Sequence, residues 1–301
     1  MNNLLLICTA VFLGCSKQTN DHGLTDYLNR NTVSDFAPEL CLKDNTYKGS
    51  FSDDYKTFYF FRKKSPELEK YIPYQSNYIN GKWYEAKIPD YYDNKSSYTY
   101  QLKIPHSEQL VFLSDKRIES DTSQIPNYNF WLINSTENAS SPRELGYQSL
   151  IYNYNSQPCI SKNGTIYFTS DEPDWSATHS YKMKRVENGY DEPELFEPVN
   201  RWRDQYEDWT VYEFCMAPNE DYMIVCIEDN SYINPSVDLY ISYFKDSEWS
   251  IPEKLGNGIN TTATENFPVI TADGNFLIFT RGFSEFKIIP INALLGPNEI
   301  M

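Results

Sequence analysis

The sequence predicts an all-β fold, a single β-propeller built from four-stranded antiparallel blades. Three observations indicate it: the aromatic content, a strand–turn–strand segment that recurs every 52 to 57 residues, and a second hairpin after each copy. Aromatic residues make up 16% of the 301 residues, which suits stacked β-strands and argues against a disordered chain. No apolar run reaches the roughly 18 residues that a membrane-spanning helix needs.

The repeat consists of a short strand, a polar turn and an aromatic strand. Copies lie at residues 51–60, 104–112, 160–168, 216–225 and 270–279. The copies close on Phe60, Phe112, Phe168, Val225 and Phe279. Successive closing residues are 52, 56, 57 and 54 positions apart. Asn163-Gly164 and Asp273-Gly274 accept a positive φ and join two strands tightly. The other three copies lack this dipeptide.

A second hairpin follows each copy. The clearest has strands at 238–244 and 248–255, and weaker echoes lie at 80–84, 131–145 and 188–193. Each period therefore holds four strands, and four-stranded units repeated radially are the blades of a propeller. Five copies predict five blades, and a degenerate sixth blade stays open.

The last copy carries a family resemblance. Its residues 272–279, Ala-Asp-Gly-Asn-Phe-Leu-Ile-Phe, resemble the repeat core of the TolB-like, WD40-like (PD40) β-propeller family, Ser-Pro-Asp-Gly-Lys-x-Leu-Tyr-Phe. The resemblance covers most of residues 34–295, and residues 35–60 resemble the entry segment of exported members. The last blade lacks a fourth strand, and residues 37–40 resemble the close of one. We therefore expect residues 34–41 to complete the last blade and close the ring.

The first residues predict an export signal. Residues 4–14 form a short apolar stretch, and Phe12-Leu13-Gly14-Cys15 resembles a bacterial lipobox. That resemblance implies a lipoprotein of the bacterial cell envelope, anchored to the lipid bilayer through acylated Cys15, at the outer membrane or the periplasmic face. An ordinary signal peptide is the alternative. The expected domains are a signal peptide at 1–14, a polar tether at 15–33 and the propeller at 34–301.

Cys41, Cys159, Cys215 and Cys226 remain after the signal and the lipidated cysteine. No Cys-x-x-Cys pair occurs, which argues against a structural zinc site. Cys215 and Cys226 flank a predicted tight turn. They are either a disulfide across a hairpin, which an exported compartment permits, or two buried thiols that pack as small hydrophobes.

The strand order sorts the loops onto two faces. The turns between first and second strands are short, whereas the connections at roughly 61–77, 113–127, 169–179, 196–210 and 229–236 are long and share the other face. Long loops in a compact domain are usually functional or disordered. The sequence therefore predicts that a ligand binds this long-loop face, around the mouth of the central channel.

Residues 200–209 are the most unusual of these loops, because two arginines flank a tryptophan. Trp and Arg are the anchor types of interfaces, and an indole also stacks on the faces of sugars. With a further Trp in the facing loop 171–175, the candidate binding residues are Trp175, Arg201, Trp202, Arg203, Asp208 and Trp209. Alternatively, the tryptophans fill gaps between blades and the arginines pair with nearby carboxylates.

Charge and motifs restrict the function further. The formal net charge of −16 repels phosphate backbones and argues against a nucleic-acid partner. With three histidines and no HExxH, P-loop or GxGxxG motif, no catalytic residue, metal site or cofactor is predicted.

Two main hypotheses remain. The first is a non-enzymatic module that binds a protein partner or a glycan on the long-loop face. The second is a glycoside hydrolase that uses loop carboxylates at the channel mouth. Two carboxyl groups about 5 Å or about 6.5–9.5 Å apart in a deep central pocket would favour hydrolysis, and a shallow aromatic face would favour binding. A bare structural scaffold is a third possibility.

Overall fold

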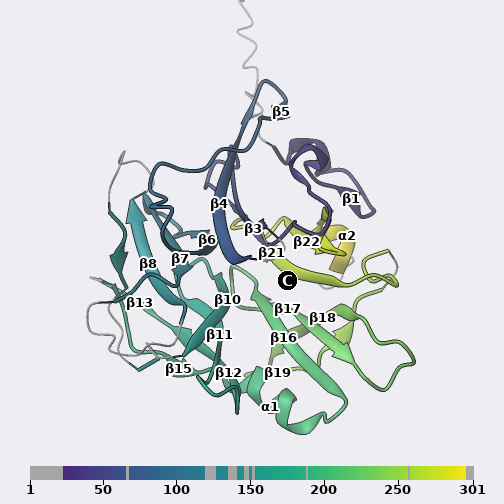
Figure 1. Cartoon of the computed structure of the whole chain (residues 1–301). Helices are drawn as coiled ribbons and strands as arrows, with labels where there is room; N and C mark the ends of the chain where they lie inside the picture. Colours follow the sequence, from purple (N-terminus) through teal and green to yellow (C-terminus); the bar gives the residue numbers. More distant parts are fainter. Residues whose placement is uncertain are drawn as a thin grey trace, which may run out of the picture.

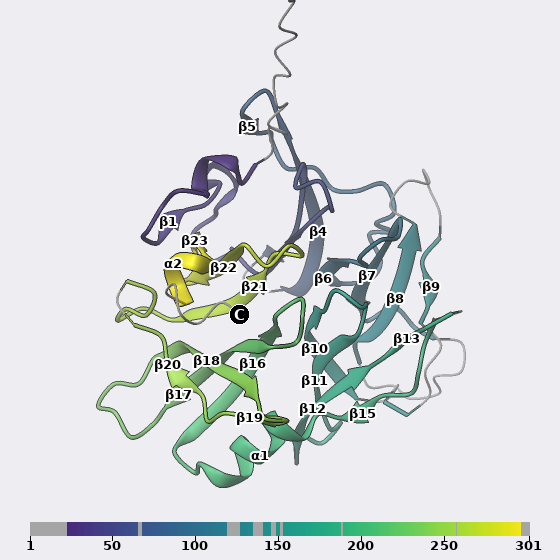
Figure 2. The same cartoon turned by 180° about the vertical axis from the view of Figure 1, so that it is seen from behind.

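The computed structural model describes residues 23–65, 68–118, 127–134, 141–145, 149–150, 153–187, 189–256 and 258–295. In these ranges, five antiparallel sheets stand around a central axis, as Figures 1 and 2 show from two sides. Each sheet has four strands in order, and one of them carries an additional short strand. The chain is a five-bladed β-propeller, so the predicted fold class is confirmed, and the described residues form no sixth blade.

The strands of the blades follow one another along the chain. Blade 1 has β2 (Gly49–Phe51), β3 (Thr57–Ser65), β4 (Leu68–Ile79) and β5 (Lys82–Trp83). Blade 2 has β6 (Tyr98–Lys103), β7 (Gln109–Ser114), β8 (Asn129–Asn134) and β9 (Arg143–Glu144). Blade 3 has β10 (Tyr154–Ile160), β11 (Ile166–Asp171), β12 (Thr178–Met183) and β15 (Glu194–Leu195), with a side hairpin of β13 (Arg185–Val186) and β14 (Gly189–Tyr190).

Blade 4 has β16 (Trp209–Met216), β17 (Tyr222–Asp229), β18 (Val237–Lys245), β19 (Glu248–Trp249) and β20 (Glu253–Lys254). Blade 5 has β21 (Glu265–Ile270), β22 (Phe276–Arg281), β23 (Glu285–Pro290) and the N-terminal β1 (Ser34–Asp35). Four short helices complete the fold: η1 (Thr25–Tyr27), η2 (Pro38–Leu40), α1 (Glu197–Gln205) and α2 (Ile291–Leu295). None of the described helices is long and apolar enough to cross a membrane.

The N-terminal strand closes the ring, as the sequence predicts. Ser34 pairs with Ile288 and Asp35 pairs with Lys287, so β1 is the outermost strand of blade 5. The strand is shorter than the expected segment 34–41, because residues 38–40 form η2. Proline has no N–H to donate to a strand ladder, which accounts for the early end of β1.

Phe36 holds this closure between blades 5 and 1. Its backbone N–H donates to the carbonyl of Phe286 at 2.9 Å, and its side chain is fully buried. Its ring lies 5.1 Å from the ring of Phe58 and 5.7 Å from that of Trp83, both edge-on. The two ends of the propeller are therefore joined by a hydrophobic core as well as by strand pairing.

Part of the segment expected to be a polar tether, residues 15–33, packs on the propeller. Leu24 is fully buried, and the ring of Tyr27 in η1 lies 6.0 Å from that of Phe36. A Cβ at Gly23 would come within 2.2 Å of the Trp83 ring, so only glycine fits there. The predicted signal peptide and Cys15 lie outside the described residues.

The short turns keep one geometry even where the repeat has eroded. Gly164 and Gly274 have φ of +89° and +75°, and Tyr55 and Glu220 hold +55° and +63° in the corresponding turns. A non-glycine residue in this conformation costs about 1–2 kcal/mol. The repeated strands on either side therefore impose the turn on residues that do not favour it.

Two of the long connections differ from the expected loops. Residues 61–77 are mostly a continuous hairpin of β3 and β4, paired from Thr57–Asn77 to Lys63–Tyr71. Residues 196–210 contain helix α1, with Pro198 in its first turn, where the missing N–H costs nothing. The apolar spacing of Phe196, Val199 and Trp202 is the helical signal in this stretch.

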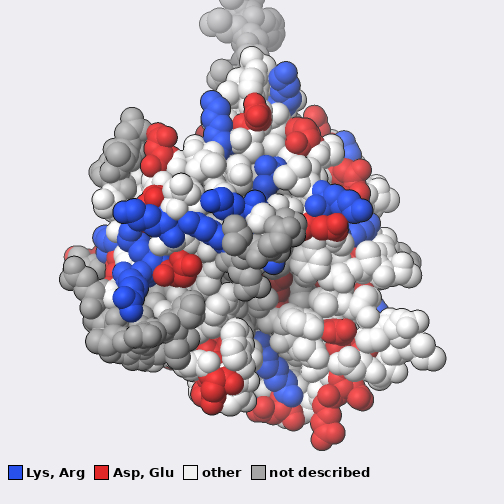
Figure 3. Space-filling model, viewed as in Figure 1, with Lys and Arg blue, Asp and Glu red and all other residues white. Residues whose placement is uncertain are grey.

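The acidic excess of the chain is unevenly distributed. In the view of Figure 3, Lys and Arg side chains gather over blades 1 and 2, and Asp and Glu side chains gather at the edge around α1. The net charge of −16 therefore does not describe the local potential on every surface.

Candidate functional site: the central channel

The innermost strands β2, β6, β10, β16 and β21 line the channel, and their antiparallel registers align them with one another. Five residues occupy one equivalent position in this alignment: Lys48, Tyr100, Gln157, Glu213 and Phe267. Lys48 lies just before β2, and each of the others lies within its strand. We call these five residues the waist. Two residues further along each strand, toward the short turns, a second ring holds Ser50, Leu102, Cys159, Cys215 and Val269.

A buried ion pair crosses the waist. The Nζ of Lys48 lies 3.6 Å from Oε2 of Glu213, and both side chains are 1% exposed. The same Nζ lies 6.0 Å from the centre of the Tyr100 ring, and Oε1 of Glu213 accepts a hydrogen bond from the Phe267 N–H at 2.6 Å. Neither Lys48 Nζ nor Glu213 Oε2 has a hydrogen-bond partner in the structure.

The buried position of this pair perturbs both groups. Burial raises the pKa of Glu213, because a carboxylate loses hydration there. Burial alone would lower the pKa of Lys48, but the Glu213 carboxylate and the nearby sulfur atoms of Cys215, Cys159 and Cys226 together raise it. The waist divides the channel into a mouth on the long-loop face and a mouth on the short-turn face.

β-Bulges shape the long-loop side of the waist. The register of the inner strands shifts between Thr99 and Leu102 and between Asn266 and Val269, and comparable shifts occur in blades 3 and 4. Tyr100 and Phe267 sit in these bulges with φ of +52° and +54°, which is rare for bulky residues. Bulges re-aim side chains, and backbone strain of about 1–3 kcal/mol per residue is typical of functional sites.

The long-loop mouth is a cavity of about 90 Å³ with mostly aromatic walls. Seven rings line it, and together we call them the aromatic mouth: Tyr47, Phe61, Tyr71, Tyr100, Tyr128, Tyr154 and Phe267. Thr99, Asn155 and Ser156 complete the lining. Among these described residues there is no carboxylate.

The rings of the aromatic mouth fix one another. Tyr47 stacks on Phe61 with centroids 5.3 Å apart, and Tyr71 meets the Phe61 ring edge-on at 5.5 Å. Across the cavity, Tyr128 and Tyr154 lie 5.0 Å apart. Burial raises the pKa of Tyr100 and of Tyr128, so these hydroxyls stay protonated at neutral pH and can donate hydrogen bonds.

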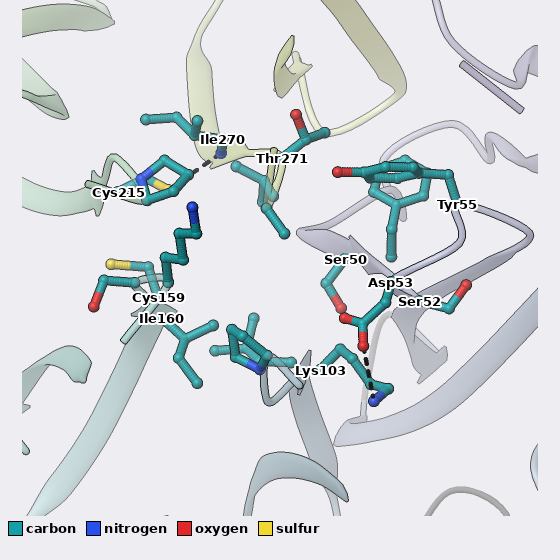
Figure 4. Close-up of a pocket in the computed structure, with 18 of the residues that line it drawn as sticks. Ser50, Ser52, Asp53, Tyr55, Lys103, Cys159, Ile160, Cys215, Ile270 and Thr271 are labelled. Carbon is teal, nitrogen blue, oxygen red and sulfur yellow. Dashed lines mark hydrogen bonds and ion pairs between the residues drawn. The ribbon is translucent and has the colours of Figure 1, made fainter. Parts of the chain in front are cut away.

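The short-turn mouth is a second cavity, of about 60 Å³, shown in Figure 4. The second ring forms its walls, and the turns of all five blades form its rim. Lys103 and Asp53 face each other at the rim, with Nζ and Oδ2 3.6 Å apart. Deeper in, Sγ of Cys215 accepts a hydrogen bond from the Ile270 N–H at 3.3 Å.

The four cysteines in the described part of the chain are free thiols, so the disulfide alternative for Cys215 and Cys226 does not hold in the structure. Cys215 pairs in register with Ile224, and the thiol of Cys226 faces Glu213 Oε1 at 3.8 Å. Cys226 lies two residues beyond Ile224 along β17, so the hairpin register itself keeps Cys215 and Cys226 from facing each other. Both thiols are buried, as the other alternative expects.

Two of the candidate binding residues hold helix α1 in place. Trp202 is only 4% exposed and belongs to the core of blades 3 and 4. The Arg203 guanidinium donates to Ser180 Oγ at 2.9 Å and to the Val211 carbonyl at 3.2 Å, and burial lowers its pKa to about 10. These side chains form no exposed anchor, because the helix turns them inward.

The other four candidates lie on different elements. Arg201 is exposed on α1, Asp208 is exposed beyond it, and Trp209 stacks on Tyr206 with centroids 4.3 Å apart. Trp175 is 67% exposed, and its ring lies 5.3 Å from that of Tyr154 in the aromatic mouth. Trp175 therefore contacts a ring of the aromatic mouth, and Trp209 begins the channel-lining strand β16.

Sequence reasoning missed the aromatic mouth itself. Tyr100, Glu213 and Phe267 occupy the waist position of the repeat, a few residues before each polar turn. An alignment of the copies extended upstream of the turn would have shown this position. Within the described residues, no group of three or more His, Cys, Asp or Glu side chains is arranged to hold a metal ion.

Comparisons with known proteins give likenesses to solved structures alone. No family model matches the chain, and a search of curated proteins gives no significant match. Among solved structures, the chain is similar to a calcium-binding protein, regucalcin, from Agrobacterium tumefaciens (TM-score 0.44, 10% identity, 86% of this chain and 95% of that one). It is also similar to a gluconolactonase from Xanthomonas campestris (TM-score 0.44, 8% identity, 73% and 68%).

A third similar structure is the β-propeller domain of the trilobed protease from Pyrococcus furiosus (TM-score 0.40, 11% identity, 79% and 62%). The chain is also similar to a post-proline cleaving enzyme from Rickettsia typhi, and it spans only 32% of that protein's length. At such low identity these likenesses carry no argument about activity. The sheet topology is what shows that the chain folds as a β-propeller.

Proposed function

We propose that this protein is a lipid-anchored propeller of the bacterial cell envelope that binds a glycan at the aromatic mouth. The observation that carries the proposal is the cluster of seven aromatic rings around one cavity on the long-loop face. A largely preformed cavity with aromatic walls and a few polar groups is the usual form of a small-ligand site. A cavity of this kind suits a sugar ring better than a flat protein surface.

The chemistry of the lining supports a carbohydrate ligand. Aromatic faces pack against the C–H face of a sugar, and the neutral hydroxyls of Tyr100 and Tyr128 can hydrogen-bond its hydroxyl groups. Exposed Trp175, which packs on Tyr154, extends the aromatic surface outward for a further sugar unit.

A glycoside hydrolase is the alternative at the same mouth. That chemistry needs two carboxyl groups beside the glycosidic bond. The described lining offers none, and Glu213 in the waist below is engaged with Lys48 and the Phe267 N–H. This arrangement supports binding over hydrolysis.

The family assignment and the anchor complete the proposal. The five-bladed fold and residues 272–279 support membership of the TolB-like, WD40-like (PD40) family. The lipobox-like residues 12–15 support acylation at Cys15. A tethered propeller with a stacking site would hold a glycan close to the membrane.

A glycan array tests the ligand. Wild-type protein should bind a defined set of glycans, and Tyr71→Ala should weaken that binding about tenfold, because one stacking surface of about 1.4 kcal/mol is lost. Tyr232→Ala is the matched control, since it removes an exposed tyrosine of the β17–β18 loop. Melting curves check that both variants fold. A blank array, or equal losses in both variants, would count against the aromatic mouth.

Radiolabelled palmitate tests the anchor. Wild-type protein expressed in a bacterial host should incorporate the label, and Cys15→Ala should incorporate none, because the acceptor sulfur is gone. Cys41→Ala should keep full incorporation and controls for the loss of a cysteine as such. Label that persists in Cys15→Ala would refute the lipid anchor.

A further inference from the structure

We propose that the short-turn mouth is a second binding site, which takes a small monocarboxylate. The carboxylate of this ligand would meet the ammonium of Lys48, and its apolar body would lie against the second ring. The site faces away from the aromatic mouth and lies on the other side of the waist. It therefore does not depend on the glycan proposal.

The ammonium of Lys48 is the first observation. It lines this cavity, is almost fully buried, and has no hydrogen-bond partner. Its distance of 3.6 Å from Glu213 Oε2 exceeds the roughly 2.7–2.9 Å of a charge-assisted hydrogen bond. A lysine has three N–H donors, and buried charged groups are normally hydrogen-bonded. The geometry therefore leaves donors for a further anion.

Glu213 does not block a second carboxylate. Its Oε1 is already held by the Phe267 N–H at 2.6 Å and faces the Cys226 thiol, away from the short-turn cavity, whose lining does not include Glu213. One ammonium with three N–H groups can serve two carboxylates. The ligand would supply the close contact that the Glu213 carboxylate does not make.

The walls above the ammonium are apolar. Leu102 and Val269 contribute hydrocarbon. The sulfur atoms of Cys159 and Cys215 each already accept a backbone hydrogen bond. Sγ of Cys159 accepts from the Met216 N–H at 3.2 Å, and Sγ of Cys215 accepts from the Ile270 N–H. The walls therefore favour an apolar ligand body over a sugar or a phosphate, which would leave polar groups unpaired.

The rim adds a local positive charge to an acidic protein. The cavity lining contains three lysines, Lys48, Lys103 and Lys162, against one carboxylate, Asp53. Lys103 pairs with Asp53 and Lys48 with Glu213, so Lys162 supplies the remaining positive charge. Such a local excess attracts anions toward the opening. The cavity thus has positive charge at the rim, an ammonium at the base and apolar walls between them. A small amphipathic monocarboxylate matches these three features.

Calorimetric titration with sodium benzoate and sodium butyrate tests the site, with sodium chloride at equal ionic strength as the salt control. Wild-type protein should bind at least one carboxylate saturably and should not bind chloride. The double variant Lys48→Met/Glu213→Gln should weaken binding at least tenfold without leaving an unpaired buried charge. Lys82→Met, which removes an exposed lysine on β5, should bind as wild type does.

A second variant guards against loss of folding. Ala272→Trp places a large side chain at the exposed rim and leaves Lys48 intact, so it should also weaken binding. Circular dichroism confirms that each variant is folded. Three results would overturn the proposal: no carboxylate binds, chloride gives the same heats, or the double variant binds as wild type does. In each of these cases water alone would satisfy Lys48.

Discussion

Lys48→Met should lower the free energy of unfolding by about 3–5 kcal/mol, because the Glu213 carboxylate would then be buried without its cation. Both side chains are 1% exposed, so bulk solvent would not offset the lost ion pair at Glu213. The double variant Lys48→Met/Glu213→Gln should recover most of this loss, since no charge remains in the waist. Urea unfolding at neutral pH measures all three proteins.

Lys82→Met is the matched control for the single and double variants of Lys48 and Glu213. It removes an exposed lysine, and its effect should stay within about 0.5 kcal/mol. If Lys48→Met costs no more than this control, the pair is not a buried ion pair and the waist does not close the channel. If the double variant is as unstable as the single one, the charges do not account for the loss.

Phe36→Ala should lower the free energy of unfolding by about 3–5 kcal/mol, the usual range for a fully buried phenylalanine. The change removes a ring that packs against Phe58 and Trp83 of blade 1, so it weakens the closure between the first and last blades. Deleting residues 34–41 should destabilise more, because it also removes the pairing of β1 with β23.

Ile233→Ala is the control for the closure, since Ile233 is 94% exposed in the β17–β18 loop. Thermal unfolding monitored by circular dichroism should show a clear drop in Tm for Phe36→Ala and almost none for Ile233→Ala. Equal Tm values for wild type and Phe36→Ala would mean that the ring is not closed by the N-terminal segment.

The fold could be predicted from the sequence because its determinants are local and repeated. Asp273-Gly274 specifies a tight turn by itself, and the repeat period places four strands in each unit. The closure by residues 34–41, of which 34–35 form the strand, followed from counting strands. Leu24 was missed because a single apolar residue in a polar stretch carries no periodic signal, although tertiary packing buries it completely.

The site could be predicted only in part, because side-chain direction depends on tertiary structure. Strand order placed it at the channel mouth on the long-loop face. Trp202 and Arg203 had the residue types of an interface, but helix α1 turns both inward. Tyr100 faces the mouth because it lies in a bulge and has a positive φ. A tyrosine in the sequence does not by itself predict such a bulge.

A crystal structure of the protein with its bound glycan tests the central claim most directly. The expected result is a sugar ring inside the aromatic mouth, packed against Tyr71 and Tyr154 and above an intact Lys48–Glu213 pair. A glycan on the outer rim or in the short-turn mouth would contradict the account. So would a glycosidic bond held between two carboxyl groups.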